Sequence, residues 1–199
     1  KYYKAGVDRY LLRHETYMAS HYRMLHPPEL SAFRRQQCLW DLKSIGYQVG
    51  TGFMVGSPFQ TAEHLAADML FIEELNPHMV GIGPFIPHHT TIFSKNPAGT
   101  LSLTLYMIGL LRLMLPKTLL PATTALNTIH AHGRELGILA GANVVMLNLS
   151  PASCQKNYSL YDHKSTSCEN AAVEKEKLTH QMKAIGYRAV ISRGDPLFI

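Results

Sequence analysis

Short apolar segments alternate with longer helical segments along almost the whole chain, and this order limits the fold more than any single motif. Strands are predicted at residues 9–15, 47–54, 79–85, 119–124, 143–149 and 187–192. Helices are predicted between them at residues 28–45, 61–75, 100–115, before 139, and 173–185. Strands that are joined through helices run parallel and are covered by those helices, so the alternation predicts an α/β fold with a parallel sheet.

A closed barrel and a doubly wound sheet both fit this alternation. A doubly wound, nucleotide-binding sheet carries a Gly-x-Gly-x-x-Gly turn or a phosphate loop between a strand and a helix. Gly50-Thr51-Gly52 is followed by Gly56 but lacks the helix start, so that signal is weak. An eight-stranded barrel typically needs about 250 residues. About five βα units in 199 residues therefore predict the later part of a barrel in residues 1–150 and a closing loop, helix and strand in 151–199.

Composition excludes several classes of protein. The net charge is +5, but the Lys and Arg residues form no basic run and no stripe with aromatic residues, which argues against nucleic-acid binding. The most apolar stretch, residues 101–115, is shorter than the about 20 residues that cross a bilayer. Cys38, Cys154 and Cys168 match no zinc, redox or disulfide spacing. We expect free thiols in a reducing cytoplasm and no membrane partner.

Residues 9–16 carry an unusual density of charge for a short, apolar strand. Alternation along a strand places Arg9, Arg13 and Glu15 on one face and His14 on the other. Burying these charges is costly unless they are paired. A ligand that carries both signs of charge is one possible partner, and an internal Arg–Glu ion pair that only stabilises the fold is the other.

Small and polar residues gather near the carboxyl ends of the predicted strands, where barrel enzymes form their active sites. The residues concerned are Gly50, Gly52, Gly81, Gly83, Thr123, Thr124, Met146 and Asn148. Each has a structural explanation, because threonine caps helices, methionine fills cores and glycine eases packing. Their shared position at one rim predicts a cavity next to Arg13 and Glu15.

Residues 9–16, 50–56, 79–88, 121–126 and 158–162 closely resemble the HydE family of radical S-adenosylmethionine (SAM) maturases of the [FeFe]-hydrogenase H-cluster. Biotin synthase and methylornithine synthase share that architecture. The resemblance spans nearly the whole chain and implies a C-terminal portion of a radical SAM (β/α)8 TIM-type barrel. In this family a Cys-x3-Cys-x2-Cys loop after the first strand holds a [4Fe–4S] cluster. No such loop occurs here, so we expect the cluster ligands in an N-terminal part and no second cluster at Cys168.

The resemblance also assigns residues to two groups of contacts. Those matched to the SAM side of the pocket are Glu15, Arg34, Met79 and Tyr158. Those matched to the substrate cavity are Arg9, Arg13, Thr123, Thr124, Met146 and Tyr161. A guanidinium group binds a carboxylate through two parallel hydrogen bonds, and a carboxylate accepts from hydroxyl or ammonium groups, which suits both ligands. No residue of this chain is expected to ligate a metal or to act directly as a catalytic group.

The implied function is a radical SAM enzyme of H-cluster assembly that acts on a small amino-acid-derived substrate in an anaerobic cytoplasm, with other maturation proteins as possible partners. These 199 residues alone are expected to be inactive. A methylornithine synthase-like or biotin synthase-like enzyme is the first alternative. A truncated module that needs a separate N-terminal half is the second, and its open sheet edges would favour association. A phosphate-binding barrel enzyme is the last, because residues 150–153 fit a phosphate loop poorly.

Overall fold

A curved, parallel sheet organises the computed structural model, which describes residues 1–146 and 171–196. One sheet contains β1 (Arg9–Leu11), β2 (Gln48–Thr51) and β4 (Met79–Val80), and two further pairs are β3 (Met54–Val55) with β5 (Gly83–Pro84) and β6 (Pro121–Ala122) with β7 (Val144–Val145). Single bridges from Glu15 to Phe53 and from Met79 to Leu119 join these pieces. β2 and β3 belong to one extended segment, residues 48–55, and β4 and β5 belong to the next, residues 79–84. Each of these segments therefore has as its neighbour the segment that follows it along the chain.

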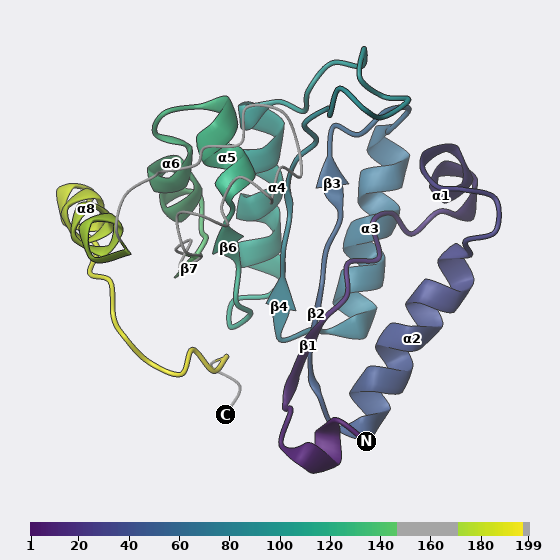
Figure 1. The fold of residues 1–199 in the computed structure, drawn as a ribbon, viewed down its shortest axis with the longest axis horizontal. Helices are drawn as coiled ribbons and strands as arrows, with labels where there is room; N and C mark the ends of the chain where they lie inside the picture. The colour runs from purple at the N-terminus through teal and green to yellow at the C-terminus, as the bar shows by residue number, and fades with distance from the viewer. Residues whose placement is uncertain (147–170, 197–199) are drawn as a thin grey trace.

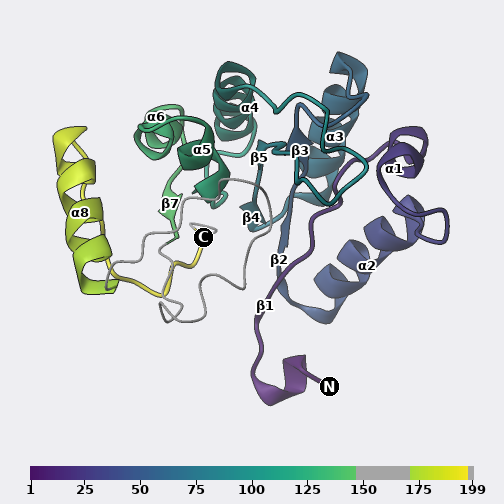
Figure 2. The ribbon, with the colours of Figure 1, turned by 45° about the horizontal axis from the view of Figure 1, so that its top comes forward.

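The strand order and the helix positions distinguish a barrel from a doubly wound sheet. A doubly wound sheet reverses its strand order and carries helices on both faces. Here the order is sequential, every pair is parallel, and the helices lie on the outer side of the curve (Figure 1 and Figure 2). These outer helices are α2 (Ala32–Ile45), α3 (Ala62–Leu75), α4 (Leu101–Met114) and α6 (Gly133–Leu139). The predicted barrel portion is confirmed.

Helix ends are set by local capping chemistry. The Thr100 hydroxyl accepts a hydrogen bond from the Leu103 amide at the start of α4, and Thr61 forms a capping box with His64 at the start of α3. Gly46 ends α2 in the left-handed conformation, with φ of +104°. These boundaries agree with the predicted ones.

Several predicted elements differ from the structure. The helix predicted from Pro28 begins at Ala32, because the Ser31 hydroxyl caps it, and a separate helix α1 (Ala19–Leu25) precedes it. The helix predicted before residue 139 is two helices, α5 (Thr124–Ile129) and α6. Gly133 allows this bend, because an added Cβ would lie 2.1 Å from the Leu126 carbonyl oxygen.

The last predicted strand, at residues 187–192, is wrong. It follows helix α8 (Ala171–Ala184), but within the described ranges it pairs with no other strand. Tyr187, Val190 and Ile191 are exposed instead. An apolar segment becomes a strand only where a neighbouring strand satisfies its backbone groups, which its own sequence does not show.

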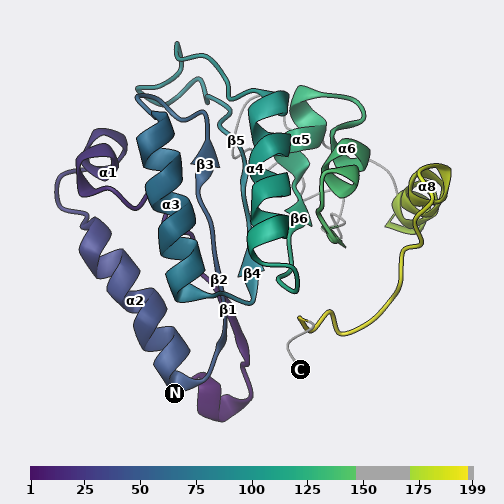
Figure 3. The same ribbon diagram turned by 180° about the vertical axis from the view of Figure 1, so that it is seen from behind.

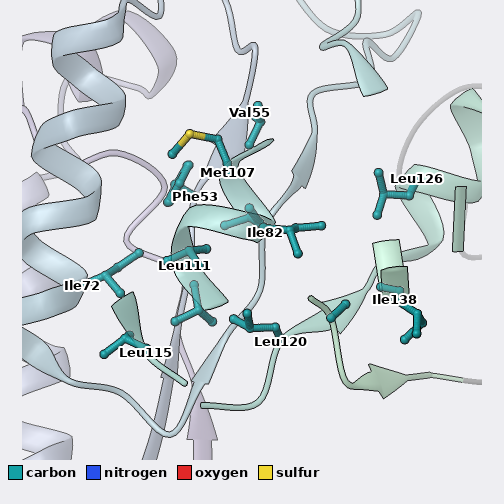
Figure 4. Packing of buried hydrophobic residues seen from close by; sticks show 14 of the residues in the cluster. Phe53, Val55, Ile72, Ile82, Met107, Leu111, Leu115, Leu120, Leu126 and Ile138 are labelled. Atoms are coloured by element: carbon teal, nitrogen blue, oxygen red, sulfur yellow. The ribbon is translucent and has the colours of Figure 1, made fainter. Parts of the chain in front are cut away.

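The hydrophobic core lies between the sheet and the outer helices. Its larger cluster includes Phe53, Val55, Ile72, Ile82, Met107, Leu111, Leu115, Leu120, Leu126 and Ile138 (Figure 4). A smaller cluster, built around Leu39 and Phe71, packs α2 and α3 onto β2, and these helices lie side by side in Figure 3. Because Phe53, Val55 and Ile82 face the helices, the residues between them face the inner side of the curve. No helix in residues 1–146 or 171–196 has the length and apolar character of a membrane span.

Candidate functional site

A cavity of about 440 Å³ opens where the strands end. Its lining residues are Arg13, Met54, Gly83, Pro84, Phe85, Ile86, His88, Thr91, Phe93, Thr123, Thr124 and Ala125. All of them lie in, or directly after, the segments that run along β1, β3, β5 and β6, and most lie at the carboxyl ends. The volume is in the range of small-molecule sites. A cavity is thus present at this rim. Of the residues predicted around it, Arg13, Gly83, Thr123 and Thr124 line it, Glu15, Gly50, Gly52, Gly81 and Met146 do not, and Asn148 lies outside the described residues.

Arg13 supplies the positive charge of the cavity. Its Nη2 lies 3.5 Å from Oε2 of Glu15, so the ion pair that sequence allowed as a structural alternative is formed, although loosely. The side chain of Arg13 is 34% exposed and that of Glu15 is 17% exposed. Nε and Nη2 of Arg13 are buried and have no hydrogen-bond partner among the described residues. Unpaired buried donors are costly, so this guanidinium is suited to receive an anionic ligand.

Thr123 adds a hydroxyl group to the same cavity. It occupies the N-cap position of α5, but its side chain makes no capping hydrogen bond. Its Oγ1 is buried and has no partner among the residues that the structure describes. The helix-capping role, which sequence left open, is therefore not the role of this hydroxyl. Arg13 and Thr123 instead present unpaired polar atoms to one enclosed space.

Gly83 keeps the space in front of Thr123 open. An ideal Cβ at Gly83 would lie 2.8 Å from Thr123 Oγ1, closer than such contacts are found. We expect Gly83→Ala to turn the threonine side chain and to lower ligand affinity about tenfold, while the free energy of unfolding falls by less than about 1 kcal/mol. Calorimetric titration with a substrate analogue that carries a carboxylate measures the affinity, and thermal unfolding measures the stability. Equal ligand affinity of Gly83→Ala and the unmodified protein would show that Gly83 does not keep a ligand site open in front of Thr123.

The rest of the cavity wall was not predicted. Phe85 and Phe93 provide apolar surface, and His88 has its Nδ1 within 3.2 Å of the Thr90 amide. Because that N–H donates to Nδ1, the neutral ring of His88 carries its proton on Nε2. Phe85 ends the third predicted strand, and His88 and Phe93 follow it. Their position at a carboxyl end is the signal that could have identified them. They lie in an irregular loop, where periodicity carries no information.

Five described residues with predicted ligand roles, Glu15 among them, do not line the cavity. Arg9 lies at the start of β1, where its Nη2 contacts Asp195 at 2.6 Å, and Arg34 is exposed on α2. Met146 is 66% exposed after β7, and Met79 pairs with Gly50 in the middle of the sheet. Tyr158, Tyr161, Cys154 and Cys168 lie outside the described residues. The roles assigned to all of these residues stay predictions.

Two histidines with lowered pKa values, His21 and His26, lie in helix α1 and directly after it. His21 is fully buried, its Nε2 donates to the Pro58 carbonyl at 2.9 Å, and its Nδ1 contacts the Thr16 hydroxyl at 3.0 Å. Burial lowers the pKa of His21, although the Pro58 hydrogen bond opposes this effect. Burial also lowers the pKa of His26.

These shifts predict a stability that decreases in mild acid. The unfolded chain binds a proton at His21 near pH 6.5, whereas the folded chain binds it only at lower pH. The free energy of unfolding therefore decreases as the pH falls below about 6.5, and we expect the thermal midpoint to be a few degrees lower at pH 5.5 than at pH 7.5. His21→Gln, which can still donate to Pro58, should reduce this dependence. An unchanged dependence in that variant would show that other groups cause it.

No metal site is present among the described residues, where no group of three or more His, Cys, Asp or Glu side chains could hold an ion. Cys38, the cysteine in this part of the chain, is exposed on α2. Residues 1–146 and 171–196 thus contain one cysteine, fewer than the three of the expected Cys-x3-Cys-x2-Cys loop.

Comparison with known proteins adds three findings. The chain is 47% identical over 164 residues to the [FeFe] hydrogenase maturase subunit HydE of Thermotoga maritima, covering 82% of this chain and 47% of that protein. It is 32% identical over 158 residues to the 3-methylornithine synthase of Methanosarcina barkeri, covering 79% and 44%. It superimposes on the crystal structure of methylornithine synthase (PylB) with a TM-score of 0.76 and 25% identity, covering 95% and 54%. The chain thus spans about half the length of the curated relatives it matches, and no protein-family model matches it.

Proposed function

We propose that this chain, a homologue of the radical SAM maturase HydE, forms the substrate-binding part of a barrel enzyme that acts in [FeFe]-hydrogenase H-cluster assembly. The observation that carries the proposal is the convergence of Arg13, Thr123 and Gly83 on one cavity at the strand ends. Other maturation proteins would be its partners, in a reducing, anaerobic cytoplasm.

The polar groups of the cavity suit a small substrate with a carboxylate. Nε and Nη2 of Arg13 and the hydroxyl of Thr123 make no hydrogen bond to the described residues, and all of them can donate to anionic oxygens. The carboxylate of Glu15 is 17% exposed beside Arg13 and can accept from hydroxyl or ammonium groups of SAM. We propose Arg13 and Thr123 as substrate contacts and Glu15 as a SAM contact.

SAM and a reduced [4Fe–4S] cluster, when bound, would together supply the radical chemistry that removes a hydrogen atom from a nearby group. The cluster ligands would come from a part of the enzyme other than the described residues. The residues seen here would orient the substrate and exclude water. Phe85 and Phe93 provide the apolar walls for that second task.

A methylornithine synthase-like activity is less well supported by the cavity. A free amino acid such as lysine carries ammonium groups, which need carboxylates. No Asp or Glu is among the residues that line the described cavity. The identity to the HydE relative is also higher, 47% against 32%.

A chimeric enzyme tests the proposal. The part of the Thermotoga maritima relative that this chain does not cover would be fused to the chain, and the iron–sulfur cluster would be reconstituted anaerobically. We expect reductive formation of 5′-deoxyadenosine from SAM and activation of an [FeFe]-hydrogenase when the other maturation factors are added. The authentic relative serves as the positive control.

Two results would contradict the proposal. Cleavage of SAM without hydrogenase activation, together with conversion of lysine to methylornithine, would favour the alternative activity. A folded chimera that holds its cluster but does not cleave SAM would favour an inactive module.

A further inference from the structure

A layer of fully buried polar side chains lies directly behind the segment that carries Arg13 and Glu15. His14, Thr51 and Asp68 are all 0% exposed. His14 Nδ1 lies 2.8 Å from the Thr51 hydroxyl, and His14 Nε2 lies 3.2 Å from Oδ1 of Asp68. The layer therefore connects the end of β1 to β2 and to helix α3.

The same carboxylate also fixes the backbone after Glu15. Asp68 Oδ1 accepts a hydrogen bond from the Tyr17 amide at 2.6 Å. Thr16, which lies between Glu15 and Tyr17 in the chain, is also 0% exposed, and its hydroxyl contacts His21. His14 on one side of Glu15 and Tyr17 on the other are thus both held by Asp68.

Glu15 itself adopts a conformation that needs such support. Its φ is +69°, in the left-handed region that side-chain-bearing residues rarely occupy. Its amide donates to the Gly52 carbonyl at 3.1 Å. Residues in this conformation persist where the surrounding structure fixes them, and they concentrate at functional sites.

Helix α2 holds the same segment from a third direction. Arg35 Nε donates to the Arg13 carbonyl at 2.6 Å, and the Gln36 side-chain amide donates to the Tyr17 carbonyl at 2.8 Å. All of these contacts act on the backbone or on the buried face of the segment. The side chains of Arg13 and Glu15 remain available on the cavity side.

A stabilising role alone does not account for this layer. Buried polar groups contribute little net stability compared with apolar side chains of the same volume. Oδ2 of Asp68 is buried and has no hydrogen-bond partner in the described part of the chain, which adds a cost. The gain is a single, fixed backbone conformation at Glu15.

We propose that His14, Thr51 and Asp68 are positioning residues, which hold residues 13–17 in the conformation that directs Arg13 and Glu15 toward the ligands. This inference rests on the proposed function for its catalytic consequence. The positioning itself concerns only the backbone of this segment.

The test compares two threonine substitutions that remove one buried hydroxyl each. Thr51→Val removes the contact to His14, whereas Thr118→Val removes a hydrogen bond from a 1% exposed hydroxyl to the Pro77 carbonyl, away from the cavity. Asp68→Asn is a second, isosteric variant, and Thr51→Ser should restore the contact. The readouts are amide hydrogen exchange at Glu15 and Tyr17 in the 199-residue chain and the KM for SAM in the chimera.

We expect faster exchange at both amides and a KM for SAM raised about two- to tenfold in Thr51→Val and Asp68→Asn, as for the loss of a single hydrogen bond. Thr118→Val should lose similar thermal stability but change neither readout, and Thr51→Ser should resemble the unmodified protein. Equal behaviour of the two valine variants would overturn the inference. The unmodified chimera itself could fail to cleave SAM. Faster amide exchange in the two variants of the 199-residue chain would then still support the positioning role, and only the proposed function would be contradicted.

Discussion

Replacing Arg13 with leucine is expected to lower the rate of hydrogenase activation by the chimera about 30- to 1,000-fold, equivalent to about 2–4 kcal/mol. The guanidinium is the positively charged group among the described residues that line the cavity, and two of its buried donors make no hydrogen bond to the described residues. Its removal leaves the substrate carboxylate unpaired. It also leaves Glu15 without the charge that lies 3.5 Å away. The measurement is the initial rate of activation at a saturating concentration of SAM.

Two further variants separate charge, geometry and general damage. Arg13→Lys keeps the charge but not the planar, two-pronged donor, so it should recover only part of the rate. Arg23→Leu removes an exposed arginine from α1 and should leave the rate unchanged. Full activity of Arg13→Leu would show that the cavity does not bind the substrate.

Gly52→Ala is expected to lower the free energy of unfolding by about 3 kcal/mol, at the upper end of the effects of overpacking. An ideal Cβ at this position would lie 1.9 Å from the carbonyl oxygen of Gly81, which belongs to the neighbouring strand segment. Backbone atoms of a sheet cannot move aside as a flexible side chain can. The strands would separate, and the hydrogen bond from the Glu15 amide to Gly52 would be strained as well.

Gly81→Ala is the matched control for this substitution. The nearest atom to an added Cβ at Gly81 is the Thr51 carbonyl oxygen, at the ordinary contact distance of 3.9 Å. We expect its effect to stay within about 1 kcal/mol, since alanine also restricts the unfolded chain. Urea unfolding measures both variants, and similar losses in the two would refute the close approach at Gly52.

Part of the fold follows from short-range signals that any reader of the sequence can use. The start of α3 at Thr61 and of α4 at Thr100, and the end of α2 at Gly46, were predicted because a cap forms between residues that are three or four positions apart. The unpredicted division between α5 and α6 depends instead on how closely Gly133 approaches Leu126.

The candidate site also contains features that the sequence predicted and features that it did not. Alternation along residues 9–15 and the rule that barrel sites lie at strand ends together predicted that Arg13 and Thr123 meet, and they line one cavity. This reasoning did not distinguish Arg13 from Arg9. Arg9 is predicted on the same face, but it lies at the other end of the predicted strand and contacts Asp195. Alternation along a strand predicts on which face a side chain lies, but not at which end of the strand it lies.

The sequence by itself determined the alternation of strands and helices and the ends of α3 and α4, because these depend on residues close together in the chain. Tertiary structure alone decided that Asp68 reaches His14 across 54 positions, that Glu15 takes a left-handed conformation, and that residues 187–192 pair with no described strand. Such features arise only when distant segments exclude water and share their hydrogen bonds, and no local pattern records which segments those are.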